Sequence, residues 1–277
     1  MPETELIANL LQGIGLRSAS FIVTVYGDVV VPRGGVLWTG TLIEICAGVG
    51  INESLVRTAV SRLVAAHRLR GERVGRRSYY HLDASAHQEF EQAAALLFGP
   101  EVETRGWQIL HAPGLSEDAA RLQRMGHMGG SVFIRPDRGQ QVPEGALAFH
   151  ASNSEGIQRI AQFWDLSALQ ERYIDMIERF GPLDAAQKDG SLSDEAALIA
   201  RLLLVHVYRN VMLRDPRLPP NALPSGWKGQ EARAFFQRLY RRLSPSAEHH
   251  IAARFEGVDG YLPAQTAASE ARLDGLS

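Results

Sequence analysis

A strongly basic segment, residues 52–82, constrains the fold of this chain more than any other feature. From Arg57 to Leu82 the sequence has seven arginines and one acid, Glu72, a net charge of +6, although the whole chain has a formal charge of −2. The segment reads as an amphipathic helix, a tight turn and an alternating hairpin around Gly75. This order predicts the helix and β-ribbon of a winged helix-turn-helix, a form that presses into the DNA major groove.

The helix predicted after Asn52, its N-cap, has two faces at 100° per residue. The apolar face carries Leu55, Val56, Ala59, Val60 and Leu63. A charged helix face is usually only solvated, but this one has no acid after Glu53 and continues into the basic hairpin. The residues that we expect to contact DNA are Ser54, Arg57, Thr58, Ser61, Arg62, Arg68, Arg73, Arg76 and Arg77.

Within this set the helix and the hairpin have different expected roles. Arg57, Thr58, Ser61 and Arg62 would reach base edges, where each good bidentate pair discriminates by about 1–3 kcal/mol. The hairpin arginines would hold phosphates or enter the minor groove. Two copies of the chain are needed for enough contacts and for a palindromic operator, so we expect a homodimer.

Composition bounds the remaining possibilities. A chain of 277 residues with 45% hydrophobic and 22% charged residues is typical of a globular protein of two or three domains. The single cysteine, Cys46, excludes a disulfide framework and a thiolate zinc finger within one chain. No apolar run approaches about 20 residues, and the N-terminus is acidic rather than basic. We therefore expect a cytoplasmic protein with no membrane partner.

The patterns predict a multidomain α+β fold. Residues 1–98 are expected to form the winged helix-turn-helix domain, with a first helix at Ser20–Val31 and a second at Trp38–Ala47 capped by Thr39 or Thr41. The apolar run Ser20–Val31 is also compatible with a strand. Residues 99–165 read as strand, helix, strand, strand, helix, strand, the order of a ferredoxin-like domain, with the last helix near Glu155 and the last strand at Ile160–Trp164. Residues 166–264 read as a helical effector and dimerisation domain, and residues 265–277 as a flexible tail.

Several motifs, in order along the chain, resemble one family. They are Pro32-Arg33-Gly34-Gly35, Gly50-Ile51-Asn52, Val56-Arg57-Thr58-Ala59-Val60-Ser61-Arg62-Leu63, Arg73-Val74-Gly75-Arg76-Arg77-Ser78-Tyr79-Tyr80, Trp164-Asp165-Leu166, Leu203-Leu204-Val205-His206-Val207-Tyr208-Arg209, Arg214-Asp215-Pro216 and Leu218-Pro219. Each is weak alone, but their order is specific. Over about residues 17–262 the chain resembles the PaaX-type transcriptional repressors of phenylacetate and related aromatic-acid catabolism.

The resemblance implies a winged-helix domain, a central ferredoxin-like domain and a helical C-terminal domain. It also implies a dimeric repressor that an aryl-CoA thioester, such as phenylacetyl-CoA, releases from its double-stranded DNA operator. The departures from the family pattern are mainly central, at Met125-Gly126-His127-Met128 and residues 146–154. The resemblance does not identify the effector of this member.

Two interpretations stay open for the polar residues of the helical region. His206, Tyr208, Arg209 and Arg214 either form a buried network between helices or bind the effector. Arg209 and Arg214 would meet the phosphates of an acyl-CoA, and Trp164 would line an apolar acyl pocket. No other cofactor is expected.

Enzyme and metal interpretations have less support in the sequence. Arg201-x4-His206 resembles a motif of some helical ribonucleases, but residues five apart lie about 140° apart on a helix. The neighbours His249 and His250 point to different helix faces, which disfavours a metal site. We therefore expect no catalytic residues. The alternatives to a repressor are an architectural or non-specific DNA-binding protein and, second, a helical-domain ribonuclease.

Overall fold

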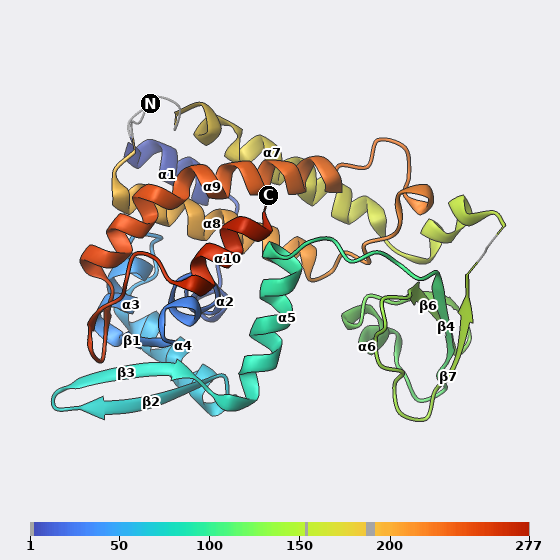
Figure 1. Ribbon diagram of the computed structural model, residues 1–277, viewed down its shortest axis with the longest axis horizontal. Helices are drawn as coiled ribbons and strands as arrows, with labels where there is room; N and C mark the ends of the chain where they lie inside the picture. Colours follow the sequence, from blue (N-terminus) through green and yellow to red (C-terminus); the bar gives the residue numbers. More distant parts are fainter. Residues whose placement is uncertain (1–2, 153–154, 187–191, 277) are drawn as a thin grey trace. The chain divides into compact units, whose positions relative to one another are not determined.

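The computed structural model describes residues 3–152, 155–186 and 192–276, which form a mixed helix and sheet protein (Figure 1). The α+β class expected from the sequence is therefore found. The chain divides into two compact units. The first comprises Met1–Pro100, Met176–Arg209 and Arg233–Ser277, and the second comprises Glu101–Asp175 and Asn210–Ala232. Residues 166–264, the expected helical domain, are thus shared between the units.

The N-terminal part of the first unit combines short helices with a three-stranded antiparallel sheet. Its elements are α1 (Glu3–Leu11), α2 (Ser18–Val25), the π-helix η1 (Tyr26–Val30), the 3-10 helix η2 (Val31–Arg33), β1 (Val36–Trp38), α3 (Thr39–Ala47), α4 (Glu53–Ala65), β2 (Leu69–Val74), β3 (Arg77–Leu82), η3 (Ala84–Ala86) and α5 (His87–Phe98). The strand order is β1-β3-β2. Helix α2 packs against α3 and α4.

The apolar run Ser20–Val31 is helical, as predicted, and does not form a strand. Phe21, Ile22 and Val25 are fully buried on α2, which continues directly into the wider π-helix η1. It turns back at Gly34 and Gly35, whose φ angles of 91° and 78° favour glycine. Strand β1 follows at once; it was not predicted, because three residues are too short for a period-2 pattern.

Helices α3 and α4 begin differently from one another. Asn52 caps α4 by accepting a hydrogen bond from the Leu55 amide at 3.0 Å, as predicted. The predicted threonine cap of α3 is wrong: Trp38 is the N-cap residue, and Thr39 instead donates to the Ser78 carbonyl of β3 at 2.7 Å. Leu55 was placed on the buried face of α4, but its position in the first turn leaves it 49% exposed.

The C-terminal part of the first unit is mainly helical. Its elements are the later residues of α7 (Leu166–Ala186), most of α8 (Asp194–Met212) and α9 (Gly229–Arg254), the short strands β8 (Glu256–Gly257) and β9 (Gly260–Tyr261), and α10 (Ala267–Gly275). Helix α9 runs past the predicted end at Leu243 and includes Pro245. Ala247 and Ile251 of this extension are fully buried, so their packing offsets the missing proline hydrogen bond.

The expectation of a flexible tail from residue 265 is wrong for the described residues. Thr266 and Ser269 form a capping box that starts α10. Arg272 donates to the Gly27 carbonyl at 2.7 Å and lies over the Phe98 ring, and Leu276 is buried. The alanine-rich composition did not reveal these contacts, because their partners lie far away in the sequence.

The second unit contains a four-stranded antiparallel sheet. Its elements are β4 (Trp107–His111), α6 (Glu117–Leu122), β5 (Gly126–Gly129), β6 (Val132–Pro136), β7 (Leu147–Ala151), the 3-10 helix η4 (Ile157–Phe163), the first part of α7 and the 3-10 helix η6 (Pro220–Ala222). The strand order is β5-β6-β4-β7. Leu110, Ala120, Met125 and Phe133 are among its core residues.

Two sequence predictions fail in this unit. The predicted strand at Ile160–Trp164 is wrong, because Ile157–Phe163 form the 3-10 helix η4, which begins two residues after Glu155, where the short helix was predicted. Among the described residues, no helix lies between β6 and β7. Strand β5 was not predicted, because Gly-His-Met-Gly has no strand pattern of its own and is specified by pairing with β6.

Across the described ranges, no helix has both the length and the apolar character that a membrane span requires.

Candidate nucleic-acid interface

The residues predicted to contact DNA are almost all on the surface. On α4, Val56, Ala59, Val60 and Leu63 are buried. The opposite face is solvent-exposed and carries Ser54, Arg57, Thr58, Ser61 and Arg62. The spacing of 3.6 residues per turn produces this separation, because the buried positions recur on one side of the helix.

The polar contacts on the exposed face of α4 are local. Arg57 donates through Nε and Nη2 to the Glu53 carboxylate at 2.8 and 2.7 Å, one helical turn away. Thr58 donates to the Ser54 carbonyl at 2.9 Å. An exposed ion pair of this kind is weak, so a phosphate or guanine can replace Glu53 as the partner of Arg57. Arg62 has no ion pair with any residue that the structure describes.

Strands β2 and β3 form a hairpin that projects at the lower left of Figure 1. Its tip is Gly75, with a φ of 61°, and Arg73 donates to the Gly75 carbonyl at 3.2 Å. Arg76 is exposed beside this tip, without an acidic partner within the described ranges. Near the base of β3, Tyr80 lies against Gly71, where a Cβ would approach its ring to 2.8 Å, so a side chain there would displace the ring.

Two arginines of the predicted set are engaged by acids that are distant in the sequence. Arg77 forms an ion pair with Glu256 of β8 and lies 4.4 Å above the Trp38 ring. Arg68 is half-buried and forms an ion pair with Glu89 of α5. Both residues therefore anchor the hairpin to the rest of the unit, a role that local sequence patterns could not reveal.

Arg70 is a further exposed arginine that the predicted set omitted. It lies on β2 opposite His81 of β3, and no described acid pairs with it. Its signal in the sequence was its place in the basic run. Together Arg62, Arg70, Arg73 and Arg76 leave uncompensated positive charge on α4 and the hairpin, which favours a polyanion such as nucleic acid.

Two protein-family models match this chain. The first, described as PaaX-like protein, matches residues 17–86, which contain α4 and the hairpin. The second, described as PaaX-like protein C-terminal domain, matches residues 164–253. Together they cover more than half of the chain. The chain belongs to the PaaX-like family.

One curated relative agrees with this assignment over nearly the full length. The PaaX-like chain is 28% identical over 298 residues to the transcriptional repressor PaaX of Escherichia coli (strain K12), a match that covers 98% of this chain and 94% of the relative. Among solved structures, it is similar to an uncharacterized protein from Mycobacterium tuberculosis, with a TM-score of 0.46, 20% identity, and coverage of 75% of this chain and 90% of the other.

Three of the predicted effector residues of this PaaX-like protein lie in the first unit. His206 is 2% exposed, and its Nδ1 lies 3.0 Å from the Thr24 hydroxyl of α2. Tyr208 is buried with its ring stacked on Phe236 at 4.2 Å. Arg209 donates to the carbonyl and hydroxyl oxygens of Ser20, both at 3.1 Å. The contacts of His206 and Arg209 join α8 to α2, and the contact of Tyr208 joins α8 to α9, which fits the network interpretation.

The other two predicted effector residues lie in the second unit. Trp164 is half-buried, and its indole nitrogen donates to the Arg124 carbonyl at 3.1 Å. Arg214 is exposed and donates to the Asn210 carbonyl at 2.5 Å, one turn back along the chain. The five predicted residues are therefore divided between the units, three in the first and two in the second.

The buried position of His206 predicts a pH-dependent stability. Burial and the nearby Arg209 charge lower its pKa from 6.5 to about 4. Because the folded pKa lies below the unfolded one, the contribution of the neutral ring is complete above about pH 6.5 and is lost as the pH falls towards 4. In urea titrations the free energy of unfolding should fall over this range.

The matched variant for this titration is His206→Asn, which keeps a polar atom near Thr24. This variant should take up about one proton fewer on unfolding. The slope of its free energy of unfolding against pH should therefore be smaller by up to about 1.4 kcal/mol per pH unit. Burial also lowers the pKa of His250, so only the difference between the two proteins reports on His206. Identical slopes would contradict the buried neutral ring.

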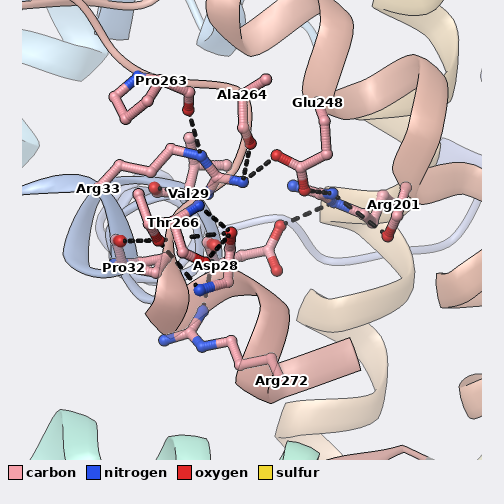
Figure 2. A network of polar contacts seen from close by, with 12 residues as sticks. Asp28, Val29, Pro32, Arg33, Arg201, Glu248, Pro263, Ala264, Thr266 and Arg272 are labelled. Atoms are coloured by element: carbon pink, nitrogen blue, oxygen red, sulfur yellow. Dashed lines mark hydrogen bonds and ion pairs between the residues drawn. The ribbon is translucent and has the colours of Figure 1, made fainter. Parts of the chain in front are cut away.

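A buried charge network lies beside the N-terminal helices of the first unit (Figure 2). Arg201 of α8 is fully buried and donates to the Asp28 carboxylate at 3.0 Å and to the Glu248 carboxylate at 2.6 Å. Arg33 forms an ion pair with the second oxygen of Glu248. Tyr240 donates to the other Asp28 oxygen at 2.8 Å. The network joins η1 and η2 to α8 and α9.

The positions of Arg201 and His206 argue against a ribonuclease role for the Arg201-x4-His206 motif. The Arg201 side chain is enclosed with Asp28 and Glu248, and the His206 ring lies against Thr24. Both side chains are buried, so neither is accessible to an RNA phosphate. The geometry therefore gives this motif a structural role.

Proposed function

We propose that this PaaX-like protein is a transcriptional repressor that binds a double-stranded DNA operator through α4 and the β2–β3 hairpin. The observation that carries the proposal is the surface of α4, whose polar, arginine-containing face is exposed to solvent. Beside it lies a hairpin whose arginines, apart from Arg77, lack acidic partners among the described residues. Membership of the family and the similarity to the Escherichia coli transcriptional repressor support the same function.

The arrangement of the N-terminal elements supports a winged helix-turn-helix. The order α2, β1, α3, α4, β2, β3 places α4 as the reading helix and the hairpin as the wing. In the second unit, the order β5-β6-β4-β7 with α6 between β4 and β5 supports a ferredoxin-like sheet in which a loop replaces the second helix. The helical region would carry effector binding and dimerisation.

A homodimer with a palindromic operator is the proposed binding form. Selection of duplexes from a random-sequence pool should yield two inverted half-sites with centres about 10 base pairs apart, one helical turn, or a multiple of that spacing. Light scattering should give the mass of two chains at the concentrations used for selection. A monomer that selects one unrepeated site would contradict this form.

The proposed effector is an aryl-CoA thioester, which would release the operator. It can do so only if it binds the DNA-free state more tightly than the DNA-bound state. Thermal unfolding should shift upwards with a suitable thioester, by about 2.7 kcal/mol of stabilisation at about 100 times its dissociation constant. The same concentration should dissociate the selected duplex. If no acyl-CoA stabilises the protein or releases DNA, the effector part of the proposal is wrong.

A further inference from the structure

Four arginines in the second unit come from four separate segments and lie near enough for their charges to interact, and Arg138 contacts Arg217 directly. Arg124 follows α6, Arg135 is on β6, Arg138 lies in the loop after β6, and Arg217 follows α8. Arg135 is buried, and the other three are half-buried. None of them forms an ion pair with an acid in the ranges that the structure describes, although partly buried charges are normally paired.

The hydrogen bonds of these arginines go to neutral acceptors. Arg135 is satisfied by the Gln108 side chain at 2.7 Å and the Gln141 carbonyl at 2.6 Å, which gives it a structural role. Arg138 donates to the Val102 carbonyl at 3.1 Å and to the Arg217 carbonyl. The guanidinium groups of Arg138, Arg217 and Arg124 therefore form no direct ion pair with a described carboxylate, although the Asp215 charge acts on all three.

Two of these groups keep free donors. The Nε atom of Arg217 is buried and has no hydrogen-bond partner among the described residues. The Arg124 guanidinium likewise has no described hydrogen bond, although the Arg124 carbonyl accepts one from Trp164. A buried donor without a partner is unfavourable, so a ligand that supplies an acceptor to the Arg217 Nε atom would recover this energy.

The carboxylates near the cluster are already engaged elsewhere. Asp215 accepts hydrogen bonds from the Tyr173 hydroxyl at 2.5 Å and from the Arg217 amide at 2.6 Å. Asp137 is bound by the Gly139 amide at 2.9 Å and by His150 at 2.7 Å. Glu101 is exposed. The three guanidinium groups therefore share one nearby buried carboxylate, Asp215, and their positive charge is only partly compensated.

The positive charges of the three arginines also repel one another. Burial and the guanidinium groups of Arg138 and Arg124 lower the pKa of Arg217 to about 10. Burial lowers the pKa of Arg124 and of Arg138 as well. All three remain cationic at neutral pH, so the repulsion persists until an anion reduces it.

The backbone at two of these arginines is strained. Arg124 has a φ of 61° and Arg217 a φ of 52°, and among the described non-glycine residues only His67 is also in this region. Arg124 occupies the position after a helix where glycine is the usual residue. Arginine is less favourable than glycine in this conformation, because its Cβ approaches the following carbonyl oxygen. Residues with a strained backbone of this kind concentrate at ligand sites, where the function of the side chain requires that residue.

We propose that Arg124, Arg138 and Arg217 form a binding site for the phosphate groups of a phosphorylated small molecule. Guanidinium groups bind phosphate through parallel hydrogen bonds, and several converging arginines suit a ligand with more than one negative charge. The half-buried Trp164 beside Arg124 offers an aromatic surface to the rest of that ligand. This rests on the proposed function in one respect: it assigns the anionic part of the effector to the second unit.

Inorganic pyrophosphate is the probe for this site. In isothermal titration calorimetry with the full chain at constant ionic strength, pyrophosphate should bind saturably. Arg124→Gly and Arg217→Asn should each weaken binding by about tenfold or more, because each removes a charge-assisted contact. Both replacements tolerate a positive φ, so their thermal midpoints should not fall below that of the native chain.

Arg121→Gln is the matched control. Arg121 is an exposed arginine of α6 that pairs with Glu117 and Asp118, and its loss should leave pyrophosphate binding unchanged. Absence of saturable binding, or equal binding by the native chain and both cluster variants, would overturn the proposal. So would cluster variants that weaken DNA binding and leave pyrophosphate binding intact, because the arginines would then serve DNA.

A parallel measurement of operator release separates this site from the proposed function. If an aryl-CoA releases DNA equally from the native chain and from Arg124→Gly, the repressor function stands and the site assignment is wrong. If pyrophosphate binds at the cluster but no aryl-CoA releases DNA, the site is supported and the effector identity is wrong.

Discussion

Replacement of Arg201 by alanine should lower the free energy of unfolding by about 3–5 kcal/mol, because it leaves the carboxylates of Asp28 and Glu248 buried without their shared cation. Urea unfolding followed by circular dichroism measures this loss. The matched control is Arg238→Ala, which removes an exposed ion pair of α9 with Asp184 and should cost no more than about 1 kcal/mol. Equal losses in the two variants would contradict the network.

A second variant identifies the cause of that loss. If uncompensated charge is responsible, Arg201→Met combined with Asp28→Asn should be more stable than Arg201→Met alone, and Glu248 keeps Arg33 as its partner in both variants. The comparison keeps side-chain volume nearly constant, so packing changes little. A double variant no more stable than the single one would show that packing around Arg201, and not charge pairing, holds η1 against α8 and α9.

The double replacement Arg57→Ala plus Arg62→Ala should remove most of the preference for the operator sequence. If each arginine makes one bidentate contact with a base, the affinity for the selected duplex falls by about 10²- to 10⁴-fold. Both side chains are exposed, so the thermal midpoint should remain close to that of the native chain. Fluorescence anisotropy with a labelled duplex measures the affinity.

The control for this prediction removes the same charge from elsewhere. Arg159 and Arg172 are exposed residues of the second unit, and their joint replacement by alanine changes the net charge equally. That variant should keep the operator preference, apart from a small uniform loss of affinity. If instead Arg57→Ala plus Arg62→Ala keeps the preference, α4 is not the helix that reads the sequence.

The surface of α4 was predictable because it depends on local geometry. The helical period separates Arg57 and Arg62 from Val56 and Val60, and burial follows from that separation. Leu55 shows the limit of this reasoning: periodicity placed it on the apolar arc, but its place in the first turn leaves it half exposed. Strands β1 and β5 are specified by their partners and carry little pattern of their own.

Contacts between distant segments were not predictable in the same way. The partners of Arg68 and Arg77, Glu89 and Glu256, lie in other elements. His206 meets Thr24 across 182 positions of sequence. No spacing rule connects such residues, because side-chain chemistry is local while tertiary distance is set by the whole fold.

The arginine cluster of the second unit illustrates the same limit at a candidate ligand site. The sequence suggested Arg209 and Arg214 for the phosphates of an effector, and both belong to motifs that resemble the family. In the structure Arg209 binds the Ser20 oxygens and Arg214 binds the Asn210 carbonyl. Arg124 and Arg217 were not singled out, since their positive φ angles and missing partners exist only in the folded chain.

The ratio of affinities for the selected duplex and for a scrambled duplex of equal length tests sequence-specific DNA binding most directly. Fluorescence anisotropy at physiological salt should give a ratio of about 10³ or more for the native chain. Affinity for both duplexes should fall as salt rises, because phosphate contacts release counterions. A ratio near one at every salt concentration would contradict the repressor account and would instead indicate an architectural or non-specific DNA-binding protein.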